Sequence, residues 1–355
     1  MIAAGRSSGS TTPGTMTLEV RRADLRLVAP FRISGYTFES TPVVVATASR
    51  RGVSGRGEAA GVYYLDDTPE KAAAQLRALA PTLEEGLTRE AVQRLLPPGA
   101  ARNALDCALW ELEARERNVE VWQLAGLAAV RPLLTTVTLG AGDPAVMAAG
   151  AKANHFARAL KLKLTGDTDV DIARVRAVRA ARPDVWLGVD ANQGFTPPTL
   201  APLLPVLVEA GVKLLEQPFR RGREADLDGL RLPVPVAADE SCLHLGELEA
   251  MRGRFDVVNI KLDKCGGLTE GLAIARGARA LGMKVMVGNM LGTSLSVGPG
   301  FILGQYCDVV DLDGPLLIAE DPPPTVRYDD GYLSCPPEVW GPKARLTAGP
   351  RADAV

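Results

Sequence analysis

Residues 185–216 read VWLGVDANQGFTPPTLAPLLPVLVEAGVKLLE, and this stretch decides the fold. It begins with a short apolar run that ends in Asp190, continues through an Ala- and Leu-rich segment that ends at Gly211, and closes with a second apolar run that ends in Glu216. A strand, a helix and a second strand in this order predict a β/α/β unit, which joins two parallel strands. The pattern therefore favours an α/β fold with a parallel sheet.

The same alternation of short apolar runs and helical segments continues along the chain from Pro132 onward. We expect eight strands, at residues 135–139, 159–164, 185–190, 212–216, 236–239, 257–262, 284–287 and 309–312. Eight strands with intervening helices predict a (β/α)7–8 TIM-type barrel, in which the chemistry lies at the carboxyl ends of the strands.

The segment before the barrel has a different pattern. Residues 16–61 alternate in part and contain the β-branched run TPVVVATAS, which predicts a small antiparallel sheet. In ARNALDCALWELEAR, apolar residues recur at helical spacing. We therefore divide the chain into a tail that is disordered or a start-site artefact (1–15), an α+β capping domain (16–125), the barrel with the catalytic residues (126–325) and a C-terminal segment that returns to the capping domain (326–355).

The composition excludes several classes of partner. The chain has 355 residues with 40 Lys and Arg against 42 Asp and Glu, so it offers no basic stripe for nucleic acid or anionic lipid. Its five cysteines form no C-x-x-C pair, and no apolar run is long enough for a membrane-spanning helix. We expect a cytoplasmic homo-oligomer with reduced thiols that acts on a small molecule, without nucleic acid or membrane partners.

Three acidic residues stand at the ends of successive predicted strands: Asp190, Glu216 and Asp239. Their separations of 26 residues (216 − 190) and 23 residues (239 − 216) each match one β/α unit, so the carboxylates converge. Converging carboxylates repel one another unless a cation lies between them, and all-oxygen ligation favours Mg2+. We predict one Mg2+ per subunit, with Asn192 in a supporting role. A single acid could instead be solvated or cap a helix, but the recurrence at the barrel period favours the metal site.

The second predicted strand lies in ALKLKLTG, residues 159–166. Its leucines occupy one face, and Lys161 and Lys163 occupy the other. In a barrel both lysines face inward, and the repulsion between two ammonium groups lowers the pKa of at least one, which suits a base near neutral pH. The alternative is an edge strand with a solvated lysine face.

Two further lysines lie in VNIKLDKCGG, residues 258–267. Lys264 follows Asp239 by 25 residues (264 − 239), one barrel unit, so we expect it to face the metal from the side opposite Lys163. Two bases on opposite faces of one carbon suit removal of a proton from one face and its return from the other. Lys261 receives a supporting role, and either lysine could instead be a surface residue. Neither of the two histidines lies at a strand end, so lysine must carry the proton transfer.

The eighth predicted strand lies in VVDLDGPLL, residues 309–317. Asp311 and Asp313 are two residues apart on it and therefore point the same way. Two carboxylates at the barrel mouth, away from the metal trio, predict a site for the ammonium group of a substrate. The alternative for Asp313 is a turn, because Asp-Gly-Pro is a turn signal.

These motifs together resemble a known family. The K-x-K of the second strand, the D/E/D set of the third to fifth strands and the lysine before CGG are similar to the muconate lactonizing branch of the enolase superfamily. The D-x-D followed by Gly-Pro resembles the dipeptide epimerases of that branch, such as L-Ala-D/L-Glu epimerase. The resemblance covers nearly the whole chain after Met16, because ARNALDCALWELEA is also similar to the capping-domain helix of the family.

The resemblance implies a Mg2+-dependent 1,1-proton transfer at the α-carbon of the C-terminal residue of an L,L-dipeptide, through an enediolate. It implies that Lys163 and Lys264 are the acid/base catalysts. Lys161 would tune Lys163 and contact the substrate, and Asp311 and Asp313 would hold the α-ammonium group. Alternatives on the same lysines and metal are o-succinylbenzoate synthesis, N-acylamino acid racemisation and cycloisomerisation, whose substrates lack a free ammonium group. A non-catalytic binding barrel is a remote alternative from another class.

One departure from the family concerns the substrate. Members that act on Ala-Glu tend to carry an arginine in the capping-domain loop that covers the site. Counting from Phe31 in APFRISGYTFES places Tyr36 there as a substrate-binding residue, with Arg32 nearby. A buried glutamate needs a cationic partner, so we expect that Ala-Glu is not the preferred substrate.

Overall fold

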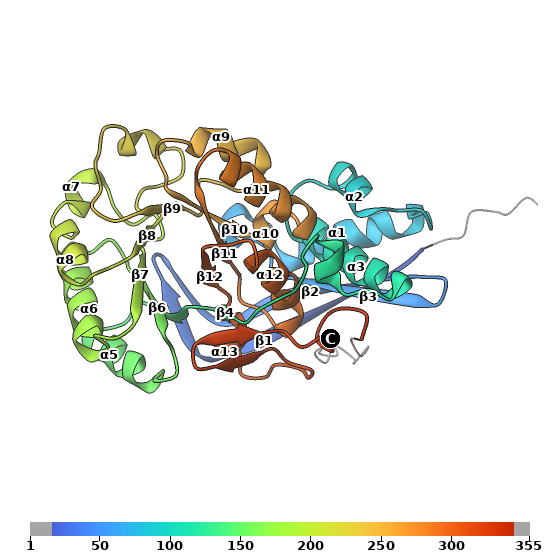
Figure 1. Cartoon of the computed structure of the whole chain (residues 1–355), viewed down its shortest axis with the longest axis horizontal. Helices are drawn as coiled ribbons and strands as arrows, with labels where there is room; N and C mark the ends of the chain where they lie inside the picture. Colours follow the sequence, from blue (N-terminus) through green and yellow to red (C-terminus); the bar gives the residue numbers. More distant parts are fainter. Residues whose placement is uncertain (1–15, 344–355) are drawn as a thin grey trace, which may run out of the picture.

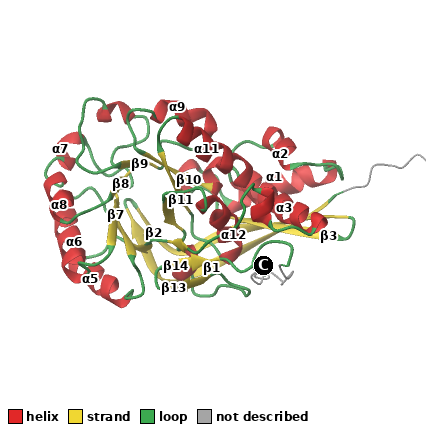
Figure 2. Cartoon of the chain, in the orientation of Figure 1, coloured by secondary structure: helices red, strands yellow, loops and turns green. Residues whose placement is uncertain are grey.

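The structure is a computed structural model, and it describes residues 16–343. The predicted tail at 1–15 therefore lies outside the described residues. Eight parallel strands form one sheet in the order β12-β11-β10-β9-β8-β7-β6-β5, with helices outside it (Figures 1 and 2). The strands are β5 (Val137–Leu139), β6 (Ala159–Lys163), β7 (Trp186–Asp190), β8 (Leu214–Glu216), β9 (Val236–Ala238), β10 (Val257–Lys261), β11 (Lys284–Gly288) and β12 (Val309–Asp311). Each lies within a predicted strand or within one residue of it, so the predicted barrel is confirmed.

The first and last strands approach each other and almost close the barrel. The amide of Thr136, just before β5, donates to the carbonyl of Val310 on β12 at 3.0 Å. The helices around the barrel are α5 (Pro144–Ala153), α6 (Thr168–Ala181), α7 (Pro197–Leu200), α8 (Leu204–Glu209), α9 (Leu248–Met251), α10 (Leu262–Cys265), α11 (Leu268–Ala280), α12 (Ser294–Gly304) and α13 (Gly314–Leu317). Among residues 16–343, no helix has the length and apolarity needed to cross a membrane.

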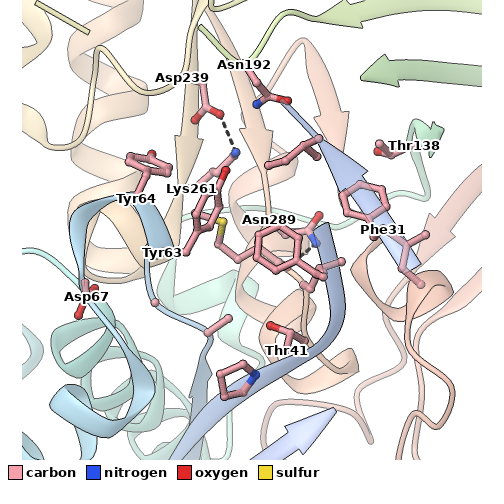
Figure 3. Close-up of a pocket in the computed structure, with 18 of the residues that line it drawn as sticks. Phe31, Thr41, Tyr63, Tyr64, Asp67, Thr138, Asn192, Asp239, Lys261 and Asn289 are labelled. Atoms are coloured by element: carbon pink, nitrogen blue, oxygen red, sulfur yellow. Dashed lines mark hydrogen bonds and ion pairs between the residues drawn. The ribbon is translucent and has the colours of Figure 1, made fainter. Parts of the chain in front are cut away.

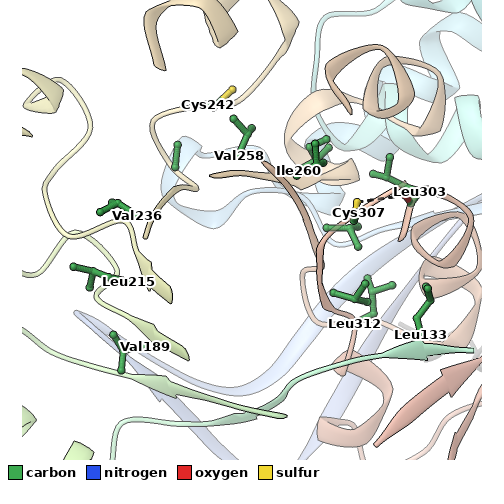
Figure 4. Packing of buried hydrophobic residues seen from close by; sticks show 14 of the residues in the cluster. Leu133, Val189, Leu215, Val236, Cys242, Val258, Ile260, Leu303, Cys307 and Leu312 are labelled. Carbon is green, nitrogen blue, oxygen red and sulfur yellow. Dashed lines mark hydrogen bonds between the residues drawn. The ribbon is translucent and has the colours of Figure 1, made fainter. Parts of the chain in front are cut away.

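The alternation of side chains along each strand separates two apolar layers. Val189, Leu215, Val236 and Val258 on successive strands belong to the large core between strands and helices (Figure 4). The residues of opposite parity form a small cluster inside the barrel, made of Leu214, Ala237, Val257 and Met286. This inner cluster is the apolar floor beneath the strand ends, where the polar residues stand.

The capping domain is an antiparallel sheet covered by helices. Its strands are β1 (Thr17–Ile33), β2 (Tyr36–Arg50) and β3 (Val53–Ala59), in the order β1-β2-β3. Its helices are α1 (Pro69–Leu79), α2 (Arg89–Leu95), α3 (Ala100–Arg117) and α4 (Val121–Leu124). Helix α3 lies so close to β3 that a Cβ at Gly57 would be 2.1 Å from the carbonyl oxygen of Ala104, so this strand position requires glycine.

Helix α3 also contacts the barrel at the CGG sequence after β10. Gly266 and Gly267 have φ of +74° and +114°, and a Cβ on them would be 2.2 Å from Arg102 Nε and 2.5 Å from Asp106 Oδ2. These glycines therefore let the capping domain approach the barrel closely.

The C-terminal segment has two parts. Strands β13 (Arg327–Asp329) and β14 (Tyr332–Ser334) form a small sheet with β4 (Leu133–Leu134), next to the start of the barrel. Farther along, Trp340 reaches the capping domain, where its Nε1 donates to the carbonyl of Arg56 at 3.0 Å.

Candidate active site

The three predicted acids meet at the carboxyl ends of neighbouring strands. Asp190 ends β7, Glu216 ends β8, and Asp239 follows β9 directly. Asp190 and Glu216 are partners in the parallel register, so their side chains stand at the same height. One carboxylate oxygen from each of the three lies within 4.8 Å of the others, and all three side chains are buried.

The electrostatics of this trio fit a cation. Burial and the neighbouring carboxylate of Asp190 raise the pKa of Glu216 to about 7. Asn259 Nδ2 donates to Glu216 Oε1 at 2.6 Å, but the buried Oε2 accepts no hydrogen bond from a described residue. A divalent ion between the oxygens would coordinate this oxygen, and an all-carboxylate donor set suits Mg2+.

Two lysines of β6 stand on one flank of the acids. Lys163 Nζ lies 2.5 Å from Asp190 Oδ2. Lys161 Nζ pairs with Asp311 and lies 3.4 Å from Glu216 Oε2. Burial alone lowers the pKa of Lys161, but the carboxylates of Asp311, Glu216 and Asp190 together raise it. The neighbouring acids therefore set the direction of the pKa shift of Lys161, and the predicted lowering at one of the two lysines stays a prediction.

Two lysines also approach Asp239 from the other flank, but they differ in position. Lys261 is the last residue of β10, and its Nζ lies 2.6 Å from Asp239 Oδ2. Lys264 lies in α10, and its Nζ donates to Asp239 Oδ1 at 2.7 Å and to the carbonyl of Asn259 at 2.9 Å. Burial alone would raise the pKa of Asp239, but the charges and hydrogen bonds of the two lysines lower it by more, so the net shift is downward. Gly288 on β11 makes room here, since a Cβ would be 3.2 Å from Lys261 Cε.

The D-x-D pair lies across the mouth from the metal trio. Asp311 accepts hydrogen bonds from Lys161 and Thr136, and Asp313 accepts one from the amide of Thr138 at 2.6 Å. Burial and the charge of Asp311 raise the pKa of Asp313 to about 6. Asp313 is 4% exposed, so it lies inside the site instead of on a solvated turn.

A cavity of about 220 Å³ opens onto this cluster, and Asp239 is the member of the acid trio that lines it (Figure 3). Its barrel side includes Lys161, Lys163, Lys261, Asn192, Asp239, Asp311 and Asp313. Its other side comes from the capping domain, including Phe31, Phe38 and Tyr63. A carboxylate substrate in this cavity could lie against a cation held by the acids, with an amine on either side of its α-carbon.

Comparison with known proteins agrees with this geometry. Residues 16–126 match the N-terminal domain of the mandelate racemase / muconate lactonizing enzyme family, and residues 143–339 match the enolase C-terminal domain-like family. The chain belongs to the enolase superfamily. Over 317 residues it is 39% identical to the L-Ala-D/L-Glu epimerase of Escherichia coli (strain K12), a match that covers 89% of this chain and 99% of that protein.

Two solved structures of the superfamily are also similar. One is an enolase family member from Agrobacterium tumefaciens with bound sodium and L-Ala-L-Glu, at 38% identity and a TM-score of 0.88, covering 92% of this chain and 100% of that one. The other is a dipeptide epimerase from Enterococcus faecalis V583 with Mg and L-Leu-L-Tyr, at 26% identity and a TM-score of 0.82, covering 91% and 97%.

In this enolase-superfamily site, Lys261 and Lys264 lie differently with respect to the cavity. Lys261 lines the cavity, whereas Lys264 does not and instead lies behind Asp239. The interval of one barrel unit pointed to Lys264, but β10 ends at Lys261 and the chain turns at once into α10. The last inward-facing strand position is therefore Lys261.

The structure also places Tyr36 differently from the sequence prediction. Tyr36 is 46% exposed and does not line the cavity, whereas Phe38, two residues along β2, does. Tyr36 stacks on Phe38 with ring centroids 6.1 Å apart, so it contacts a cavity-lining residue without lining the cavity itself. Phe38, Tyr63 and Asn259 were not among the residues predicted for the site. Of these three, only Asn259 could have been predicted from the sequence, because it stands two residues before Lys261 and therefore on the same strand face.

Proposed function

We propose that the protein is a Mg2+-dependent dipeptide epimerase in which Lys163 and Lys261 exchange the α-proton of the C-terminal residue. The observation that carries this proposal is the placement of the two amines. Lys163 ends β6 and Lys261 ends β10, while the three strands between them, β7 to β9, carry the acids. The amines thus reach the space above the acids from opposite flanks, as proton removal and return on opposite faces require. The names of the E. coli and E. faecalis relatives support the same reaction.

Each group has a distinct role in this proposal. Mg2+ held by Asp190, Glu216 and Asp239 would bind the substrate carboxylate and stabilise the negative charge that develops there. The neutral amine of one lysine takes the α-proton, and the ammonium group of the other returns a proton to the opposite face. The reaction is therefore balanced without any further reactant.

Lys161 and Lys264 act through their neighbours. Lys161 carries a positive charge beside the acids and neutralises Asp311. Lys264 donates to both Asp239 Oδ1 and the carbonyl of Asp239, so it fixes this carboxylate for the metal and for Lys261. We assign Lys264 as a positioning residue. Asn192, whose Oδ1 is buried and lacks a partner among the described residues, lines the cavity in a supporting role.

The substrate ammonium group favours dipeptides over N-acylated acids. Because Asp311 already pairs with Lys161, Asp313 remains as a buried carboxylate that has no ion pair among residues 16–343. A free α-ammonium group would satisfy it, whereas an N-acyl group or a cycloisomerase substrate would leave it unpaired.

Proton NMR in D2O tests the reaction. L,L-dipeptides incubated with the enzyme and Mg2+ should lose the α-proton signal of the C-terminal residue as deuterium enters and the L,D form appears. Lys163→Ala and Lys261→Ala should each stop epimerisation. Exchange in N-acylamino acids but in no dipeptide would favour the racemase alternative, and no exchange in any of these compounds would leave only a binding role.

We also propose a cytoplasmic location and a homo-oligomeric state. The thiols support the location, because all five cysteines are free and four are buried in the described part of the chain. Size-exclusion chromatography with light scattering would measure the oligomeric state directly.

A further inference from the structure

The capping-domain side of the active-site cavity is an apolar wall. Phe31, Ile33, Phe38, Pro42 and Tyr63 line it. The rings of Phe38 and Tyr63 meet edge to face, with centroids 5.2 Å apart and planes at 69°. Figure 3 shows Phe31 and Tyr63 facing the cavity below Asn192 and Lys261. Such a surface binds apolar groups by removing them from water.

The pairing of β1 with β2 fixes which side chains belong to this wall. Phe31 pairs with Phe38, so their side chains share one face of the sheet. Arg32 pairs with Thr37, one step along each strand, and so both point to the other face. Arg32 is exposed and does not line the cavity. The nearest arginine in the sequence therefore does not supply a charge to the pocket.

The cationic side chains that line the cavity all lie on its barrel side, where they pair with carboxylates. Lys161, Lys163 and Lys261 are the lining residues with positive charge, and each pairs with a carboxylate of the barrel. No arginine or histidine lines the described cavity. A glutamate side chain against the capping-domain wall would therefore be desolvated without a partner.

We propose that Phe38 and Tyr63 bind the side chain of the C-terminal residue and select aromatic or large aliphatic residues over glutamate. The inference rests on the proposed function, because the dipeptide is oriented by its two ends. With its carboxylate at the acid trio and its ammonium group at Asp313, the side chain is left with the remaining wall. Tyr36 braces this wall, since its ring packs 4.6 Å from that of Tyr63.

Steady-state kinetics of the Mg2+-loaded enzyme with four dipeptides, L-Ala-L-Phe, L-Ala-L-Leu, L-Ala-L-Glu and L-Ala-L-Lys, tests this selection. We expect kcat/KM for L-Ala-L-Phe and L-Ala-L-Leu to exceed that for L-Ala-L-Glu by about tenfold or more. Equal or higher kcat/KM for L-Ala-L-Glu, or a preference for L-Ala-L-Lys, would overturn the inference and leave the epimerase assignment intact. Absence of turnover with all four would instead reject the proposed function.

Variants of the wall separate its role from general damage. Phe38→Arg introduces a guanidinium group that can pair with a glutamate side chain, so the ratio of kcat/KM for L-Ala-L-Glu to that for L-Ala-L-Phe should rise at least about tenfold. Phe38→Leu, which keeps an apolar side chain, should reduce kcat/KM for L-Ala-L-Phe and leave L-Ala-L-Glu poor. Arg32→Ala, on the opposite face of the same sheet, should leave the ratio unchanged. If Phe38→Arg and Phe38→Leu both leave the ratio unchanged, Phe38 does not contact the side chain.

Discussion

Two regions of the molecule bury carboxylates in opposite ways. At the barrel mouth the acid trio and Asp311 pair with lysines, as Asp190 does with Lys163 and Asp239 does with Lys261. At the seam between the capping domain and the barrel, the buried acids instead accept backbone amides of the other domain. Each seam acid accepts at least one such bond, namely Glu58 from Thr293, Asp106 from Thr269, and Asp263 from Ala60 and Gly61.

The pKa directions show what this difference means. Burial raises the pKa of Glu58 to about 7 and those of Asp106 and Asp263 to about 6, and none of these three acids has an ion pair among residues 16–343. At the mouth, the two lysines that contact Asp239 lower its pKa despite its burial, whereas the pKa of Glu216, beside Asp190, is raised to about 7. The seam needs only hydrogen-bond acceptors, which a protonated acid still provides. The mouth needs charge, because metal binding and proton transfer depend on it.

The largest effect should follow from neutralising one mouth acid. Asp239→Asn removes a metal ligand and leaves the ammonium groups of Lys261 and Lys264 buried without their shared partner. We expect kcat/KM for the dipeptide to fall by about 10³-fold or more and the free energy of unfolding to fall by about 3–5 kcal/mol. NMR assays and urea denaturation measure the two losses. A stable and active Asp239→Asn enzyme would show that the mouth, like the seam, needs only a hydrogen-bond acceptor at this position.

Lys264 should have a smaller effect than Lys261. Lys264→Met removes the group that fixes Asp239 but keeps the amine at the cavity, so the Mg2+ concentration for half-maximal activity should rise roughly 10- to 100-fold. Excess Mg2+ should then restore much of kcat. Lys261→Met, the matched control, should stay inactive at every Mg2+ concentration. The reverse pattern would return the role of second base to Lys264.

These two lysines also show how far sequence alone reaches. The acid trio could be predicted because strands in a barrel repeat at a near-constant interval, and the K-x-K pair because a strand alternates its faces. The choice between Lys261 and Lys264 could not, because it depends on where β10 ends and α10 begins. The seam acids follow no period at all. Glu58 meets Thr293 across 235 residues of sequence, a contact that only the docking of the two domains creates.

The seam should show its own pH dependence. Burial raises the pKa of Glu58 from 4.5 to about 7, so the folded state binds this proton more tightly than the unfolded state does. Its contribution is fully present below about pH 4.5 and is lost as pH rises to about 7, a change of about 3 kcal/mol. Glu58→Gln keeps an acceptor for the amide of Thr293 and has no charge. The wild-type minus variant difference in unfolding free energy should therefore fall across this window and level off above it. A difference that is constant with pH would contradict the assignment.

The smallest effect should come from the other side of the same contact. Thr293 Oγ1 donates to Glu58 Oε2 at 2.6 Å and also accepts from the amide of Leu295 at the start of α12. In Thr293→Val the shape is kept, but both bonds are lost.

Loss of the cap costs about 1 kcal/mol at every pH. Loss of the hydroxyl donor disfavours the ionised carboxylate, which raises the pKa of Glu58 and moves the upper end of its pH window to higher pH. Urea denaturation across pH separates the two effects, because the cap lowers the whole curve whereas the donor shifts it along the pH axis. A lowered curve without a shift would mean that the Thr293 amide alone stabilises the Glu58 carboxylate, and the seam would then be a purely backbone contact.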